Sequence, residues 1–236
     1  CLCGLPKLRP GDADYEIDKF EFVVKYMDAL VISLDPQLKT ITRVWVVAEI
    51  GEAMKDKPVY FRLARGLDLE TQEILSRGQR VTRRVCDCDA TSEEDKQMIL
   101  EKIKRNVSIE EFDLFVESMV EMNFGICRCL QRVDGAARKA FQRLRNVEIS
   151  YSWRGASLHT APEELSKIGS VLRELQCFRL NLSTCKRLTD ISALKDGLSG
   201  LQTLQHLELN FAHCIALSDI SALKGGLNGL QTLQHL

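Results

Sequence analysis

The sequence predicts an α/β protein with two parts, a compact α/β module followed by a stack of short repeated units. Residues 188–207 and 217–236 lie 29 residues apart and are identical at 17 of 20 positions, the exceptions being Thr189/Ser218, Asp196/Gly225 and Ser199/Asn228. Upstream, two short apolar runs flank a segment with helical apolar spacing, which is the strand–helix–strand order of a parallel sheet. A chain of 236 residues, 45% of them hydrophobic, is long enough to form both cores.

We expect four segments: a poorly defined N-terminal segment at 1–14, the α/β module at 15–122, a connector at 123–140 and the repeats at 141–236. The chain starts at Cys1 rather than Met and stops at Leu236 inside a repeated phrase. We therefore interpret it as an internal part of a longer protein. The net charge of −1 provides no basic field for nucleic acid or an acidic membrane. No apolar run approaches the roughly 18 residues of a membrane-spanning helix.

The first half of the module alternates helices and strands. A helix is expected over 15–29, and residues 30–34 (LVISL) form an apolar run that the Asp35-Pro36 turn stops, which predicts a buried strand. A second helix is expected over 41–55, followed by a strand over 58–63 that is entered through a proline. We expect these two strands to be parallel.

The second half of the module begins with four arginines and continues with two helices. Arg77, Arg80, Arg83 and Arg84 could grip a phosphate, but without interleaved aromatics or a glycine-rich loop they more often form a solvated rim. The helices start at the capping boxes 91–94 (TSEE) and 108–111 (SIEE), where a hydroxyl caps the helix and a glutamate follows three residues later.

The repeats share one pattern of apolar residues. Each has L-x-x-L-x-L, an Asn or Ser, a turn with a cysteine and then the phrase D-I-S-A-L, and a degenerate copy starts at Leu144. The alternation predicts a strand with one buried face, and the second apolar run predicts a helical return. We expect Cys185 and Cys214 to point inward and Asp190 and Asp219 to cap the returns.

This pattern resembles the leucine-rich repeat family, in particular its cysteine-containing type. The resemblance implies that the units stack into a leucine-rich repeat solenoid, because no unit can cover its own core. Polar residues between the leucines would then line the concave sheet and form either a protein-binding surface or a merely solvated face. The candidates for partner binding are Asn146, Glu148, Ser150, Arg179, Asn181, His206, Glu208 and Asn210, with Cys177 and His235 in the same rows.

The N-terminal module has a resemblance of its own. LVISLDP is followed by a helix with W-x-x-x-E at Trp45 and Glu49, and DCDATSEEDKQMILEKI follows downstream. These segments resemble Toll/interleukin receptor-like (TIR-like) domains, which are flavodoxin-like, and large repeat-bearing proteins of single-celled eukaryotes. In enzymatic members the matching glutamate contacts the ribose of NAD. The resemblance thus implies a catalytic role for Glu49 with Trp45 as pocket support, whereas the residues alone favour core packing for Trp45 and a solvated or salt-bridged Glu49.

The cysteines favour free thiols. There are nine, three C-x-C pairs among them, and their one-residue spacers and wide separation differ from zinc-site spacing. An odd number without a secretory signal predicts reduced thiols in the cytoplasm. We expect no bound metal and no cofactor.

The expected function is that of an intracellular signalling scaffold that binds partner proteins through the concave face. One alternative is a TIR-like NAD glycohydrolase that has the repeats as its sensor and NAD as its substrate. Another is a substrate-adaptor subunit, a role that cysteine-bearing repeats often serve. The chain has no Walker A, dinucleotide-binding, HExxH or GxSxG motif that would favour a different enzyme.

Overall fold

The computed structural model describes residues 23–53, 57–63, 67–77, 79–131, 135–142, 144–151 and 158–235. The segment at 1–14 and most of the helix expected at 15–29 lie outside these residues. The strands are β1 (Leu30–Leu34), β2 (Val59–Leu63), β3 (Asn146–Ser150), β4 (Cys177–Asn181) and β5 (His206–Asn210). The α-helices are α2 (Val44–Ala53), α3 (Leu69–Ser76), α4 (Glu93–Asn106), α5 (Ile109–Asn123), α6 (Gly135–Gln142), α7 (Ile168–Val171), α8 (Ala193–Ser199) and α9 (Ser221–Leu227). Short 3-10 turns are η1 (Lys39–Thr42), η2 (Val85–Asp87), η3 (Arg128–Gln131) and η5 (Glu163–Lys167).

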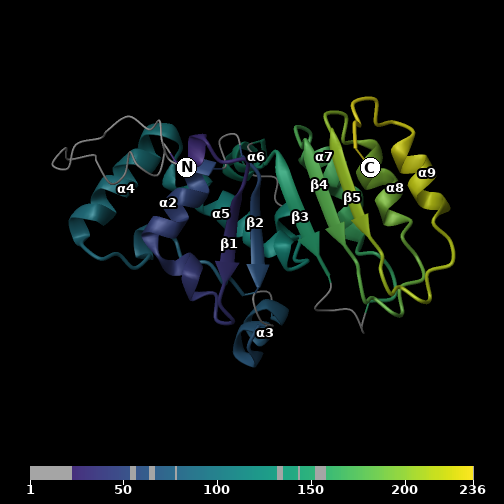
Figure 1. The fold of residues 1–236 in the computed structure, drawn as a ribbon, viewed down its shortest axis with the longest axis horizontal. Coiled ribbons are helices and arrows are strands. Elements are labelled where there is room, and N and C mark those ends of the chain that lie inside the picture. Colours follow the sequence, from purple (N-terminus) through teal and green to yellow (C-terminus); the bar gives the residue numbers. More distant parts are fainter. Residues whose placement is uncertain are drawn as a thin grey trace.

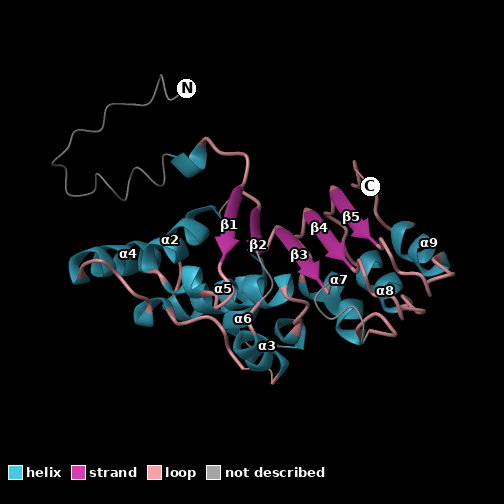
Figure 2. Ribbon diagram, turned by 60° about the horizontal axis from the view of Figure 1, so that its bottom comes forward, coloured by secondary structure: helices cyan, strands magenta, loops and turns pink. Residues whose placement is uncertain are grey.

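The protein is a mixed α/β structure with short parallel sheets. Strands β1 and β2 pair in parallel, and β3, β4 and β5 form a second parallel sheet in that order. The five strands lie side by side in chain order with their arrows pointing the same way (Figure 1). Helices α2–α9 gather on one side of the strands, and a short helical segment that precedes β1 lies outside this layer (Figure 2).

Burial along the strands matches this one-sided arrangement. In β1, Ile32 and Leu34 are buried, whereas Val31 is 59% exposed. The expectation that residues 30–34 form a buried strand therefore holds for one face only, because only alternate residues reach the helices.

The boundaries of the N-terminal elements follow local backbone chemistry. Both strands are confirmed, and their parallel pairing is as expected. Helix α2 begins at Val44 rather than at 41, since η1 precedes it. Ser108 caps α5 and accepts from the Glu111 N–H at 3.1 Å. Helix α4, in contrast, is capped by Ser92 instead of the expected Thr91, with the Asp95 N–H bonded to the serine hydroxyl at 3.1 Å.

The copy at 188–207 forms the helical return α8 and the start of β5, and the copy at 217–235 forms the return α9 and an isolated bridge between His235 and His206. The register pairs Cys177 with His206, an offset of 29 residues that equals the sequence period. Asp190 accepts from the Ser192 N–H and Asp219 from the Ser221 N–H, both at 2.7 Å. Asp190 caps the turn before α8 rather than the helix itself, because the cap position of α8 is Ser192.

The unit at β1 and β2 shares two features with the repeats. Leu30 pairs with Val59, so β1 and β2 are also offset by 29 residues. The three described non-glycine residues with positive φ are Leu38 (56°), Thr184 (66°) and His213 (64°). Each stands three residues after an acid or amide that accepts from the N–H two residues on, namely Asp35, Asn181 and Asn210. The turn after β1 therefore has the same design as the turns after β4 and β5.

Candidate protein-interaction surface

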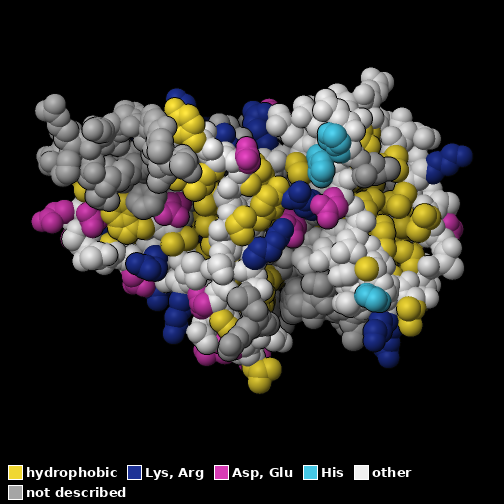
Figure 3. Space-filling view, in the orientation of Figure 1, with side chains coloured by type: hydrophobic (Ala, Val, Ile, Leu, Met, Phe, Trp, Pro, Cys, Tyr) yellow, Lys and Arg dark blue, Asp and Glu magenta, His cyan; other side chains and the backbone are white. Residues whose placement is uncertain are grey.

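The side of the strands away from the helices forms the candidate surface, which we call the strand face. Its side chains belong to residues that alternate with the buried ones, and they run across all five strands. They are Val31, Ser33, Tyr60, Arg62, Asn146, Glu148, Ser150, Cys177, Arg179, Asn181, His206, Glu208, Asn210 and His235. Figure 3 shows positive and negative side chains together near the middle of this face, next to histidines.

The strand phase expected for the repeats is confirmed. In β3 and β4 every second residue is buried, among them Val147, Ile149, Phe178 and Leu180, and the polar residues between them are half-buried. The parallel register aligns these polar residues in rows, so that Glu148, Arg179 and Glu208 are neighbours across three strands. All eight candidates for partner binding lie on this one face.

Charges on the strand face alternate and pair with each other. The Arg62 Nη1 lies 2.8 Å from the Glu148 Oε2, and the Arg179 Nε lies 2.7 Å from the Glu208 Oε2. Burial lowers the pKa of Arg179, but the hydrogen bond to Glu208 and further contacts raise it above the usual value, so the guanidinium is charged. The middle of the face therefore holds two positive and two negative groups in fixed positions.

Tyr60 adds an aromatic contact at the boundary of the two sheets. The Arg179 Cζ lies 4.5 Å from the centroid of the Tyr60 ring, and the Arg62 Cζ lies 5.3 Å from it, which is cation–π range. Tyr60 and Arg62 were absent from the sequence-based candidates. The alternation in residues 59–63 could have predicted them. Val59 and Phe61 are buried, so the residues that alternate with them must lie on the other face of the strand.

The asparagines and histidines of the face have different surroundings. Asn181 and Asn210 use their Oδ1 atoms to accept from the N–H two residues on, both at 3.0 Å, so each also shapes a turn. His206 and His235 pair in parallel register, and their ring centroids lie 5.7 Å apart with the rings tilted.

The two cysteines of the repeat turns differ in burial. Cys185 is buried as expected, while Cys214 is half-buried and its thiol donates to the Leu182 carbonyl at 3.0 Å.

Comparisons with known proteins add nothing to this geometry. No family model, curated protein or solved structure matches the chain.

Glu49 and Trp45, the residues implied by the TIR-like resemblance, lie on α2. Both are half-buried, and Trp45 packs against the hydrophobic core. Burial raises the pKa of the Glu49 carboxyl above its usual value. A cavity of about 10 Å³ lies between β2 and β3, lined by Val59, Phe115 and five other residues, and Glu49 is not among them. That volume is close to the minimum that holds one water molecule, so this cavity has no room for a nucleotide.

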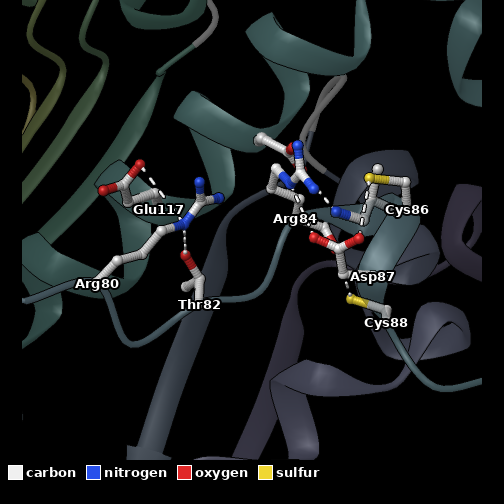
Figure 4. Close-up of polar contacts among 9 residues, drawn as sticks. Arg80, Thr82, Arg84, Cys86, Asp87, Cys88 and Glu117 are labelled. Atoms are coloured by element: carbon white, nitrogen blue, oxygen red, sulfur yellow. Dashed lines mark hydrogen bonds and ion pairs between the residues drawn. The ribbon is translucent and has the colours of Figure 1, made fainter.

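The four arginines at 77–84 each pair with a carboxylate. The Arg77 Nη2 lies 3.0 Å from the Glu73 Oε2, and the Arg80 Nε lies 3.9 Å from the Glu117 Oε2. The Arg83 Nη1 lies 3.1 Å from the Asp89 Oδ1, and the Arg84 Nε lies 2.8 Å from the Asp87 Oδ2. Figure 4 shows Arg80 reaching Glu117 of α5 and Thr82, while Arg84 reaches Asp87. In addition, the Val85 N–H donates to the Asp113 carboxylate at 2.8 Å. The cluster fastens the 80–89 segment to α5 and leaves no concentrated positive charge for a phosphate.

No group of three or more His, Cys, Asp or Glu side chains in the described part of the chain is arranged to hold a metal ion, and Cys1 and Cys3 lie outside it. None of the helices in the described ranges is long and apolar enough to cross a membrane. None of the seven described cysteines takes part in a disulfide.

Proposed function

We propose that the chain is a leucine-rich repeat solenoid that acts as a scaffold and binds partner proteins through the strand face. The single observation that supports this most is the alignment of the eight candidate residues in register on one exposed face. A parallel sheet holds its side chains at fixed spacing, so a partner meets a pre-organised surface and binding costs little ordering entropy. Polar and aromatic groups with paired charges are typical of the rim and anchors of such interfaces.

The described cysteines form no disulfide, which supports a reducing compartment, and we therefore place this scaffold in the cytoplasm. The N-terminal residues 30–63 fit the same solenoid better than a separate TIR-like module. The 29-residue offset of β1 and β2 and the turn shared with β4 and β5 favour this assignment. A partner would then meet a face that extends over Tyr60 and Arg62 as well as the repeats.

The test exchanges charges without removing an ion pair. Arg179→Glu combined with Glu208→Arg keeps a pair at this site but inverts the pattern that a partner meets. The control exchanges Glu101→Lys and Arg105→Glu, which are exposed and four residues apart on α4. Each variant is used as bait in lysate of the source organism, and the captured proteins are quantified by mass spectrometry.

We expect a defined set of proteins to be captured by the wild type and the α4 variant and to be reduced at least tenfold with the strand-face variant. Equal capture by all three baits would contradict binding through this face.

The NAD-cleaving alternative is tested on the same samples by following nicotinamide release. We expect no release above the buffer blank, and hence no difference between the wild type and Glu49→Gln. Release that disappears in Glu49→Gln would establish the alternative.

A further inference from the structure

One row of side chains on the strand face alternates in charge. It crosses four strands with one residue on each, namely Arg62 on β2, Glu148 on β3, Arg179 on β4 and Glu208 on β5. The parallel register aligns the last three residues, and the ion pair of 2.8 Å between the Arg62 Nη1 and the Glu148 Oε2 aligns the first with them. We call these four residues the charge row. Its signs read plus, minus, plus, minus.

This order of signs makes the charge row complementary to its own reverse. Suppose that a second copy faces it after a rotation of 180° about an axis that is parallel to the strands and lies between β3 and β4. Arg62 of each copy then lies opposite Glu208 of the other, and Glu148 lies opposite Arg179. Each contact occurs twice, as in any interface with a two-fold axis.

Other arrangements of the two rows bring like charges together. An axis that runs across the strands would place each residue opposite its own copy. A shift of one row along the other by one strand, about 4.8 Å, would place plus opposite plus and minus opposite minus. The charge row therefore favours one orientation and one register.

The row is accessible at its ends and fixed in its middle. The side chains of Arg62 and Glu208 are 49% and 58% exposed, whereas those of Glu148 and Arg179 are 15% and 27% exposed. The Arg179 Nε donates to the Glu208 Oε2 at 2.7 Å, so the second half of the row is also held by an ion pair. Figure 3 shows both signs at the surface in the middle of the face. Because these side chains are already ordered, little conformational entropy would be lost on binding.

The residues beside the charge row fit the same rotation. Tyr60 stands two residues before Arg62, and His206 stands two residues before Glu208, all on the strand face. The rotation that brings Arg62 to Glu208 therefore brings the half-buried Tyr60 ring to His206 of the second copy. Aromatic contact there would bury apolar surface, which the charge contacts alone do not.

We propose that the strand face binds a second copy of this chain, with the two charge rows antiparallel across a two-fold axis. This inference rests on the proposed function, because it names a protein that the strand face binds. Facing like charges oppose the other registers, so the row determines the orientation of the dimer as well as the partner. Added salt should weaken the dimer, since the ends of the row are exposed.

The test reverses the charge at one end of the row at a time. Glu208→Arg changes the signs to plus, minus, plus, plus, and Arg62→Glu changes them to minus, minus, plus, minus. Two copies of either variant would meet with like charges at both ends of the row. We expect the dissociation constant of the dimer, measured by sedimentation equilibrium, to rise about tenfold or more in each variant.

An equimolar mixture of the two variants provides the rescue. In a heterodimer of Glu208→Arg with Arg62→Glu, all four contacts along the row again join opposite signs. We expect the mixture to associate about as well as the wild type, although neither variant does so alone. Because the rescue requires two different chains, a change of stability within one chain cannot produce it.

The control variants make the same charge changes at α3. Glu73→Arg and Arg77→Glu alter side chains that are 67% and 65% exposed and lie away from the strand face. We expect each control to self-associate like the wild type, and their mixture to show no gain. Thermal unfolding of every variant checks that it is folded.

Three results would overturn the inference: a wild type that stays monomeric as its concentration is raised, self-association that the end variants leave unchanged, or loss in both variants without recovery in the mixture. The lysate capture described above separates this outcome from failure of the proposed function. Capture that depends on the strand face, together with a monomeric wild type, would support the proposed function and contradict only the second copy as occupant. A monomeric wild type with no such capture would contradict both.

Discussion

Asp35 shows how one side chain can determine a turn. Its carboxylate accepts from the N–H groups of Gln37, Lys39 and Thr40 and from the Thr40 hydroxyl, at 2.7–3.1 Å. These bonds hold Leu38 at φ 56°, a left-handed conformation that a branched apolar residue rarely adopts. Leu38 is 1% exposed, so its burial contributes the free energy that offsets this strain.

The first prediction concerns this turn. Asp35→Ala is expected to lower the free energy of unfolding by about 1–2 kcal/mol, as loss of a capping side chain does. Asp35→Asn should cost less, because asparagine makes the equivalent turn bond at 181 and 210. Urea unfolding at pH 7 measures both, and equal losses would contradict the shared turn design.

The same residue makes stability depend on pH. Burial raises the pKa of Asp35, but the bonds to Thr40, Lys39 and Gln37 outweigh it and lower the pKa from 3.8 to about 2. The folded state therefore holds this proton less tightly than the unfolded state. The stabilisation is fully present above about pH 4 and is lost as the pH falls towards 2, and both variants should lack this component.

At the scale of elements, close helix packing depends on glycines. A Cβ atom on Gly169 of α7 would lie 2.5 Å from the Gly200 Cα and 2.6 Å from the Gly197 carbonyl oxygen. These contacts involve backbone at the end of α8 and cannot be relieved by rotating a side chain. The leucine pattern does not reveal this approach, because it marks which residues face the core but not how closely two helices lie.

The second prediction uses this contact. Gly169→Ala is expected to lower the free energy of unfolding by about 1–3 kcal/mol, the cost of overpacking. Gly135→Ala on α6 is the matched control, since nothing lies within 4 Å of its Cβ position. It should be neutral or stabilising by up to about 1 kcal/mol. Similar urea midpoints for the two variants would show that α7 and α8 are free to move apart.

At the scale of the whole molecule, the two sheets meet through side chains. Among the described strands, β2 and β3 share no hydrogen-bonded ladder. The Arg62–Glu148 ion pair and the stacking of Arg179 on Tyr60 cross this boundary on the strand face. The candidate surface and the junction of the sheets are thus made by the same residues.

The third prediction tests that junction by a double-mutant cycle. Arg62→Ala, Glu148→Ala and the double variant should give a coupling energy of about 0.5–1 kcal/mol that decreases with added salt. The exposed Glu73–Arg77 pair on α3 serves as the control, with an expected coupling of about 0.3–0.5 kcal/mol. The free energy of unfolding in urea is measured for each variant. A coupling near zero for Arg62–Glu148 would mean that this ion pair does not help to join the sheets.

Much of the fold could be predicted because its signals are periodic and local. Short apolar runs located β1 and β2, alternating apolar residues located β3–β5, and the near-identity of 188–207 and 217–236 fixed the phase of two units. Single capping sites were less certain, since Thr91 and Ser92 offer equivalent hydroxyls and only the backbone direction selects between them. The eight repeat residues of the strand face were likewise identified from the alternation of β3–β5.

By itself the sequence determined the repeat, its 29-residue period and which residues alternate between core and surface, because all three are properties of the order of apolar residues along the chain. Only the tertiary structure decided that helices α2–α9 cover one side, that β1 and β2 repeat the same offset and turn, and that Tyr60 and Arg62 join the strand face. The reason is physical: these features depend on contacts between residues tens of positions apart. A carboxylate in Asp35 and an amide in Asn181 can build the same turn without any likeness in the surrounding sequence.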